Sequence, residues 1–110
     1  MDQIQWDDFT KVELRVGTIV QAEDFPEARK PAYKLTLDFG EFGIKHSSVQ
    51  ITRLYSKEEL VGRRIVIVNN LQPTVICGVE SQGMLLAACD DNAMSILGVD
   101  KEIMLGSVVK

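Results

Sequence analysis

The sequence has few of the residues that build catalytic or metal centres. His46 is the only histidine among 110 residues, and the carboxylates do not show metal-ligand spacing, which argues against a metal site. Ser47 and Ser48 beside His46 do not make a catalytic triad, because alternate strand residues point to opposite faces. No glycine-rich phosphate loop follows a predicted strand. The sequence therefore predicts a non-catalytic protein that uses no metal and no cofactor.

Cysteine is scarce as well. Cys77 and Cys89 are separated by twelve positions, with no Cys-x-x-Cys motif and no neighbouring histidine. A structural disulfide belongs to secreted proteins. The first residues, MDQIQWDDF, are acidic and polar, whereas a signal peptide begins basic and continues apolar. We therefore expect two buried thiols in a cytoplasmic protein.

No apolar run approaches the roughly 20 residues that span a bilayer. Repeats, heptads and low-complexity tracts are also missing. A chain of 110 residues fits one domain, 1–110, with a single core that needs no disulfide or metal. Turn residues recur at short intervals instead, which indicates a small domain of short strands.

Positive charge is limited but unevenly placed. Twelve basic and 16 acidic residues give a net charge of −4, which argues against an RNA partner. Residues 28–64, however, carry eight of the basic side chains and only four of the acidic ones. This middle third is the candidate surface for RNA phosphates. The alternative is that these charges only keep strand faces in water.

Alternating apolar residues predict three strands in the first half of the chain. The first runs from Val12 to Val20 and is interrupted by Gly17, where we expect a bulge or sharp bend. The second covers residues 33–39, after a loop that contains two prolines. A third covers residues 44–51, where a change in apolar parity predicts another bulge.

The second half begins with a helix signal. Ser56 and Glu59 form a capping box for a helix of one or two turns, which Gly62 ends. Apolar runs at 65–68 and 84–88 then predict buried strands, with weaker strands around 95–97 and 107–109. Three strands, a short helix and two strands is the order of an OB-fold, an all-β five-stranded Greek-key barrel. Other small barrels share this pattern.

The stretch from Leu71 to Ala88, LQPTVICGVESQGMLLAA, is the most informative segment and is called the signature stretch below. Its polar residues stand directly beside a buried strand, as in a loop that presents a ligand. With KVELRVGTIV at residues 11–20, it resembles the tRNA-binding OB-fold domain family. Residues 74–77, TVIC, replace the basic residues usual in that family. Within it, residues 23–35 and 43–52 look most like the CsaA-type proteins, small bacterial proteins described as secretion chaperones.

The resemblance implies a homodimer of OB-folds, with terminal extensions used for dimerisation, that binds tRNA or other structured RNA. Residues 1–10 are the expected docking segment, with Trp6 and Phe9 in the dimer interface. The alternative is that both rings cover the end of their own barrel. The implied RNA-binding residues are basic and polar side chains and one methionine: Arg29, Lys30, Lys34, Lys45, Asn69, Gln72, Ser81, Gln82 and Met84.

A second function of a different class remains open. A protein-export chaperone would hold unfolded presecretory proteins in an apolar groove, to which Val75, Ile76 and Cys77 would contribute. A third possibility is an accessory dimer without a ligand. The salt dependence of binding distinguishes the RNA-binding function from the chaperone function, because RNA binding weakens with added salt whereas apolar peptide binding persists.

Overall fold

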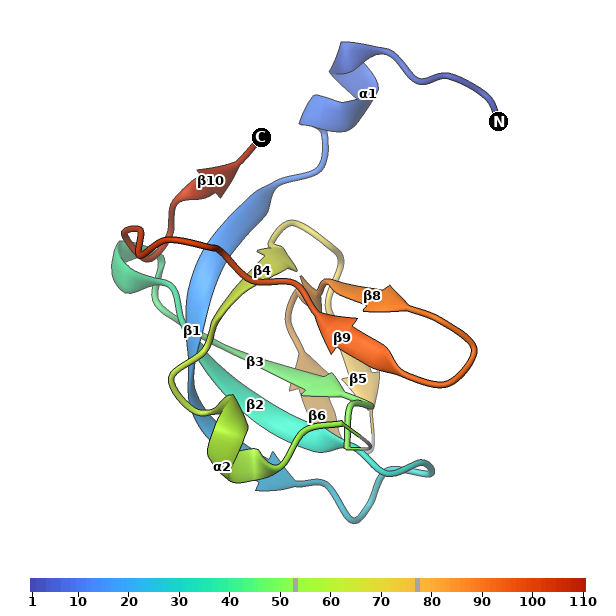
Figure 1. Ribbon diagram of the computed structural model, residues 1–110, viewed down its shortest axis with the longest axis vertical. Helices are drawn as coiled ribbons and strands as arrows, with labels where there is room; N and C mark the ends of the chain where they lie inside the picture. The colour runs from blue at the N-terminus through green and yellow to red at the C-terminus, as the bar shows by residue number, and fades with distance from the viewer. Residues whose placement is uncertain (53, 77) are drawn as a thin grey trace.

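The computed structural model describes residues 1–52, 54–76 and 78–110. Its main sheet has the order β3–β2–β1–β4–β7, with every neighbour antiparallel, and Figure 1 labels the first four of these strands. The strands of this path are β1 (Leu14–Asp24), β2 (Tyr33–Asp38), β3 (Ile44–Val49), β4 (Arg64–Val68) and β7 (Met84–Leu85). They form the predicted all-β, nearly closed five-stranded barrel.

β1 is long enough to pair with two strands of the barrel, β4 and β2. Its first half pairs with β4 and its second half with β2. The register shifts between Ile19 and Gln21, so the predicted bend lies there and not at Gly17. Gly17 has another role: a Cβ atom at this position would lie 2.5 Å from Cε1 of Phe39. Its missing side chain makes room for that ring in the core.

The core confirms the alternation predicted for the second strand. Tyr33, Leu35 and Leu37 are buried, while the residues between them are half-buried. β3 pairs with β2 without a register shift, so the bulge predicted in the third strand is wrong for residues 44–49. The apolar pattern breaks for a different reason. Lys45 and Ser47 lie opposite core residues of β2 and are polar although they face inward.

The predicted helix is α2 (Lys57–Leu60). Its capping box is confirmed: Ser56 N–H donates to Glu59 Oε1 at 2.6 Å, and Glu59 N–H donates to Ser56 Oγ at 3.3 Å. Leu60 is buried in the core. A short 3-10 turn, η1 (Gly40–Phe42), connects β2 to β3.

The signature stretch closes the barrel onto β3. Gln82 N–H donates to the carbonyl oxygen of His46 at 2.7 Å. Ser81 Oγ lies 3.3 Å from Ser47 Oγ. Gly83 follows with a φ of +79°, and a Cβ atom there would lie 2.9 Å from both Val68 O and Ile67 Cδ1. These three signature residues therefore have a structural role at the seam of the barrel.

Smaller elements surround the barrel. They are α1 (Trp6–Thr10), the hairpin of β5 (Thr74–Ile76) and β6 (Val79–Ser81), the hairpin of β8 (Ala87–Cys89) and β9 (Met94–Ile96), and β10 (Val108–Val109), which pairs with β1. The apolar run at 84–88 is thus divided between β7 and β8. Figure 1 shows α1 projecting away from the barrel. Within the described residues, no helix is long and apolar enough to cross a membrane.

Candidate nucleic-acid interface

A surface groove runs past the end of β3, between the signature stretch and the β8–β9 hairpin. Two hollows of about 400 and 600 Å³ form it, and both are lined by Gln50, Ile51 and Met94. Four of the predicted RNA-binding residues line this groove: Gln72, Ser81 and Met84 in the smaller hollow and Lys30 in the larger one. The fold therefore brings predicted site residues from distant parts of the sequence to one groove. Lys30 and Met84, for example, are 54 positions apart.

The smaller hollow has an apolar character. Met84 is 47% exposed and Met94 is 38% exposed, and Leu71 lies beside them. None of the described residues that line this hollow is charged. Gln72 and Ser81 supply polar groups. Such a surface suits an unpaired nucleobase, which has apolar faces and hydrogen-bonding edges, and it also suits an apolar peptide side chain.

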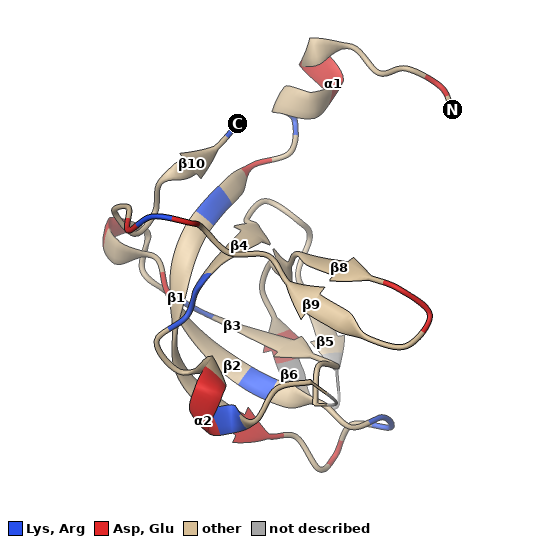
Figure 2. Cartoon of the chain, viewed as in Figure 1, with Lys and Arg blue, Asp and Glu red and all other residues tan. Residues whose placement is uncertain are grey.

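The larger hollow holds charges of both signs. Lys30 lines it together with Asp90 and Asp91 of the β8–β9 hairpin tip, which is red in Figure 2. Asp90 Oδ1 accepts the backbone N–H groups of Asn92 and Ala93, each at 2.8 Å. These two hydrogen bonds lower the pKa of Asp90, and the bond from Asn92 has the larger effect. The carboxylate therefore stays ionised at neutral pH and offsets part of the positive potential of Lys30.

Polar side chains of the signature stretch bond to β3. Ser81 Oγ accepts Ser48 N–H at 3.3 Å, and Gln82 Oε1 accepts His46 N–H at 3.2 Å. Ser81 therefore lines the groove and holds the seam at once. Gln82 is not among the residues that line either hollow. The polar patch that the sequence suggested as a ligand-binding loop thus serves barrel closure as well.

Lys45 and Asn69 belong to a different cluster. Lys45 Nζ donates to Asn69 Oδ1 at 2.6 Å. Arg15 Nε donates to Glu13 Oε1 at 2.8 Å, and this bond is the main cause of a lowered pKa for Glu13, to which Asn69 and Lys45 also contribute. Lys45 is near the start of β3, whereas Lys30 precedes β2 at the other end of the same hairpin. The structure therefore separates Lys45 and Asn69 from the groove, which Lys30 lines.

The remaining basic candidates flank the groove. Arg29 is exposed in the loop beside Lys30, and this loop is blue in Figure 2. Lys34, on β2, pairs with Ser48 of β3. Its Nζ lies 5.2 Å from the centre of the Phe25 ring. Neither residue lines a groove hollow.

Residues of the peptide-binding alternative are only partly described. Val75 is 68% exposed on the β5–β6 hairpin. The side chains of Ile76 and Cys77 lie outside the described part of the structure, so the expected burial of the Cys77 thiol has no test here. Cys89 is a free, exposed thiol, and the expectation of burial is wrong for it. It ends β8, in a two-stranded hairpin that leaves this residue open to solvent.

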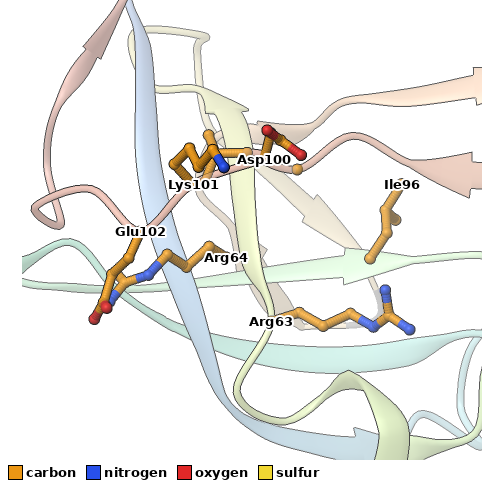
Figure 3. Close-up of a pocket in the computed structure, with 8 residues that line it drawn as sticks. Arg63, Arg64, Ile96, Asp100, Lys101 and Glu102 are labelled. Atoms are coloured by element: carbon orange, nitrogen blue, oxygen red, sulfur yellow. The ribbon is translucent and has the colours of Figure 1, made fainter.

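A separate hollow of about 440 Å³ lies beside the start of β4 (Figure 3). Arg63, Arg64 and Lys101 line it together with Asp100 and Glu102. The two arginine side chains point in opposite directions in Figure 3. Arg64 Nη2 lies 3.2 Å from Glu102 Oε1. With diverging guanidinium groups and two carboxylates, this hollow lacks the converging donors that an anion site needs.

Comparison with known proteins identifies the family of the chain. Residues 14–108 match the family model described as "Putative tRNA binding domain". The chain belongs to this tRNA-binding domain family. Over 110 residues it is 44% identical to the methionine–tRNA ligase of Methanococcus maripaludis, an alignment that covers 99% of this chain and 16% of the ligase. The chain thus spans about a sixth of the length of that relative.

Solved structures extend the likeness to the whole fold. The chaperone CsaA of Bacillus anthracis has a TM-score of 0.94 at 37% identity, covering 99% of this chain and 100% of the other. The CsaA chaperone of Picrophilus torridus has a TM-score of 0.92 at 38% identity, covering 98% and 100%. The resemblance to CsaA-type proteins and the OB-like barrel are therefore confirmed.

Sequence reasoning missed several residues that line the groove. Gln50 and Ile51 were predicted as the end of the third strand, but β3 ends at Val49 and these two residues line the groove. Leu71 stands at the start of the signature stretch, so its place in the groove was within reach. Met94 has no such signal, because only the turn of the β8–β9 hairpin brings it back to the barrel.

Proposed function

We propose that this domain binds tRNA without catalysing a reaction, and that it does so in the cytoplasm as a homodimer. The groove holds unpaired bases against Met84, and the loop of Arg29 and Lys30 contacts phosphates. Membership of the tRNA-binding domain family supports the choice of ligand. The observation that carries the proposal is the convergence of Lys30, Gln72 and Met84 on one groove.

The charges of the groove set the expected strength of binding. Its smaller hollow offers stacking and edge contacts but no basic group among the described residues. Phosphates would therefore be neutralised mainly by Arg29, Lys30 and Lys34 outside that hollow. On a single strand each neutralised phosphate contributes roughly 0.7 to the slope of log affinity against log salt concentration. Three contacts predict a slope of about −2 and modest affinity at physiological salt.

A tRNA titration over a series of salt concentrations tests the proposal. Reversing both loop charges, Arg29→Glu with Lys30→Glu, should abolish measurable binding near physiological salt. At low salt, any remaining binding should have a slope reduced by about 1.4. A matched control reverses two exposed charges that line neither groove hollow, Lys101→Glu with Lys110→Glu. Equal losses in both double variants would mean that net charge matters and the proposed loop does not.

Support for the dimer comes from α1. No residue of α1 is buried, and Trp6 is 67% exposed with its ring centre 5.5 Å from that of Phe9. Trp6 therefore does not cover the end of its own barrel, and an apolar pair of this kind fits a second copy.

The dimer proposal has its own test. Removal of residues 1–10, or Trp6→Ala with Phe9→Ala, should give monomers by light scattering at micromolar concentration. Leu54→Ala serves as a control, since Leu54 is also exposed and apolar but lies at the groove. A dimer that survives both changes would refute the docking role of α1.

The second candidate function is that of a chaperone which captures unfolded presecretory proteins; the two CsaA proteins of similar structure are described as chaperones. The uncharged smaller hollow favours this alternative, and Val75 adds an exposed apolar side chain on the hairpin whose Thr74 lines that hollow. An unfolded presecretory peptide should be titrated beside tRNA. Peptide binding that persists at high salt, with no tRNA binding at low salt, would replace the RNA proposal by the chaperone one.

A further inference from the structure

One wall of the groove stands outside the main sheet. β8 and β9 form a two-stranded sheet of their own, separate from the path of the barrel. Met94 of β9 nevertheless lines both hollows of the groove. The width of the groove therefore depends on contacts that hold β9 to the barrel other than strand pairing with the main sheet.

Tyr55 makes such a contact. Its Oη accepts the backbone N–H of Ile96 at 3.0 Å and lies 3.5 Å from Ser95 Oγ. The side chain of Tyr55 packs against the hydrophobic core. Its carbonyl oxygen accepts the phenol of Tyr33 at 2.8 Å, and the guanidinium carbon of Arg63 lies 5.3 Å from its ring centre. Tyr55 is thus fixed to the barrel and reaches β9 with one polar atom.

The geometry of the hairpin explains why a phenol is needed there. Leu97 N–H donates to Leu86 O at the open end of the hairpin, where the β8–β9 pairing continues by one residue pair. Successive N–H groups of a strand point to opposite edges, so Ile96 N–H points away from β8. Ile96 is partly buried and packs against the core. A buried N–H without an acceptor is unfavourable, and Tyr55 Oη is the acceptor that satisfies this one.

We propose that Tyr55 is a positioning residue for the ligand groove. Its phenol sets the place of β9, and thereby the separation between Met94 on one wall and Met84 on the other. Loss of the phenol lets β9 move away from the barrel and weakens ligand binding, although Tyr55 itself touches no ligand. The expected effect on ligand binding rests on the proposed function. The expected movement of β9 rests on the structure alone.

The test compares Tyr55→Phe with Tyr33→Phe. Both changes remove one phenol oxygen from the same part of the core, but only the first removes the acceptor of Ile96 N–H. In the free protein, amide exchange of Ile96 should accelerate in Tyr55→Phe while that of Leu97 stays unchanged. The methyl resonance of Met94 should also shift. Tyr33→Phe removes a bond to the Tyr55 backbone but keeps the acceptor of Ile96 N–H, so it should change the exchange of Ile96 and the Met94 resonance clearly less than Tyr55→Phe does.

Binding is then measured with tRNA at two salt concentrations. Tyr55→Phe should lower the affinity by a factor of roughly 2 to 10, the usual worth of one net hydrogen bond. Its salt slope should equal that of the unmodified protein, because no phosphate contact is lost. Ser95→Ala, which leaves the bond to Ile96, should bind normally.

The outcomes are separable. Unchanged Ile96 exchange and an unmoved Met94 resonance in Tyr55→Phe would overturn the positioning role, whatever the ligand. Equal loss of tRNA affinity in Tyr55→Phe and Tyr33→Phe would also overturn it, as general destabilisation. Absence of tRNA binding in the unmodified protein would refute the proposed function instead. The presecretory peptide then replaces tRNA as the probe, and the exchange and methyl readouts stand unaltered.

Discussion

Gly83 offers the sharpest test of how the signature stretch builds the barrel seam. Gly83→Ala places a Cβ atom in a backbone with φ of +79° and 2.9 Å from Val68 O and Ile67 Cδ1. Gly62→Ala is a matched control, since Gly62 has a φ of +95° and nothing within 4 Å of its added Cβ. Both substitutions carry the backbone penalty, and only Gly83→Ala also carries the steric one.

The magnitudes follow from these two terms. A left-handed conformation costs an L-residue roughly 1–2 kcal/mol, which is the expected loss for Gly62→Ala. Overpacking in a tight core adds about 1–3 kcal/mol, so Gly83→Ala should lose about 2–5 kcal/mol. The loss of unfolded-chain entropy that any glycine-to-alanine change brings is common to both and cancels in the comparison. A domain near the middle of the usual stability range, about 10 kcal/mol, remains largely folded after this loss.

Urea denaturation followed by far-UV circular dichroism measures the two free energies of unfolding. The difference between the variants is the cost of the contact with Val68 and Ile67. Gly83→Ala should also weaken tRNA binding, because Gly83 lines the smaller hollow of the groove. Equal unfolding free energies for the two variants would refute the steric account of this signature glycine.

Two further predictions concern charged residues. Because hydrogen bonds lower the pKa of Asp90 in the folded protein, their stabilisation is complete above its unfolded pKa of about 3.9 and is lost as the pH falls through the lower folded value. Amide protection factors of Asn92 and Ala93 should therefore fall in acid, and Asp90→Asn should remove this pH dependence. Lys45→Gln should leave tRNA affinity within about two-fold, because the amine bonds to Asn69 away from the groove. A ten-fold loss of tRNA affinity in Lys45→Gln would instead show that Lys45 belongs to the RNA-binding site.

Local rules were enough for much of the fold. The alternation in residues 33–39 predicted the buried face of β2, and Ser56 with Glu59 predicted α2 through its capping box. Both signals depend on residues close in sequence, which is why they could be interpreted without the structure. The order of strands and helix then favoured a small barrel, and the resemblance to the tRNA-binding family selected the OB type.

Other features depend on contacts between distant segments. Lys45 and Ser47 face inward because the seam of the barrel supplies polar partners, Asn69 and Ser81 respectively. The sequence of β3 does not indicate those partners. The change in which alternate residues are apolar was therefore interpreted as a bulge. The same limit applies to Met94, which reaches the groove only because the β8–β9 hairpin folds back beside residues 50–51.

The double use of the signature stretch decides which substitutions can test the ligand site. Ser81 lines the groove and also accepts Ser48 N–H, so its replacement would alter both binding and barrel closure. Met84 and Gln72 are exposed and line the same hollow, and neither side chain has a hydrogen bond at the seam among the described residues. Met84→Ala and Gln72→Ala should therefore lower tRNA affinity with unfolding free energies almost unchanged. Unaltered affinity in both would place the bound bases elsewhere on the barrel, even though the family assignment stands.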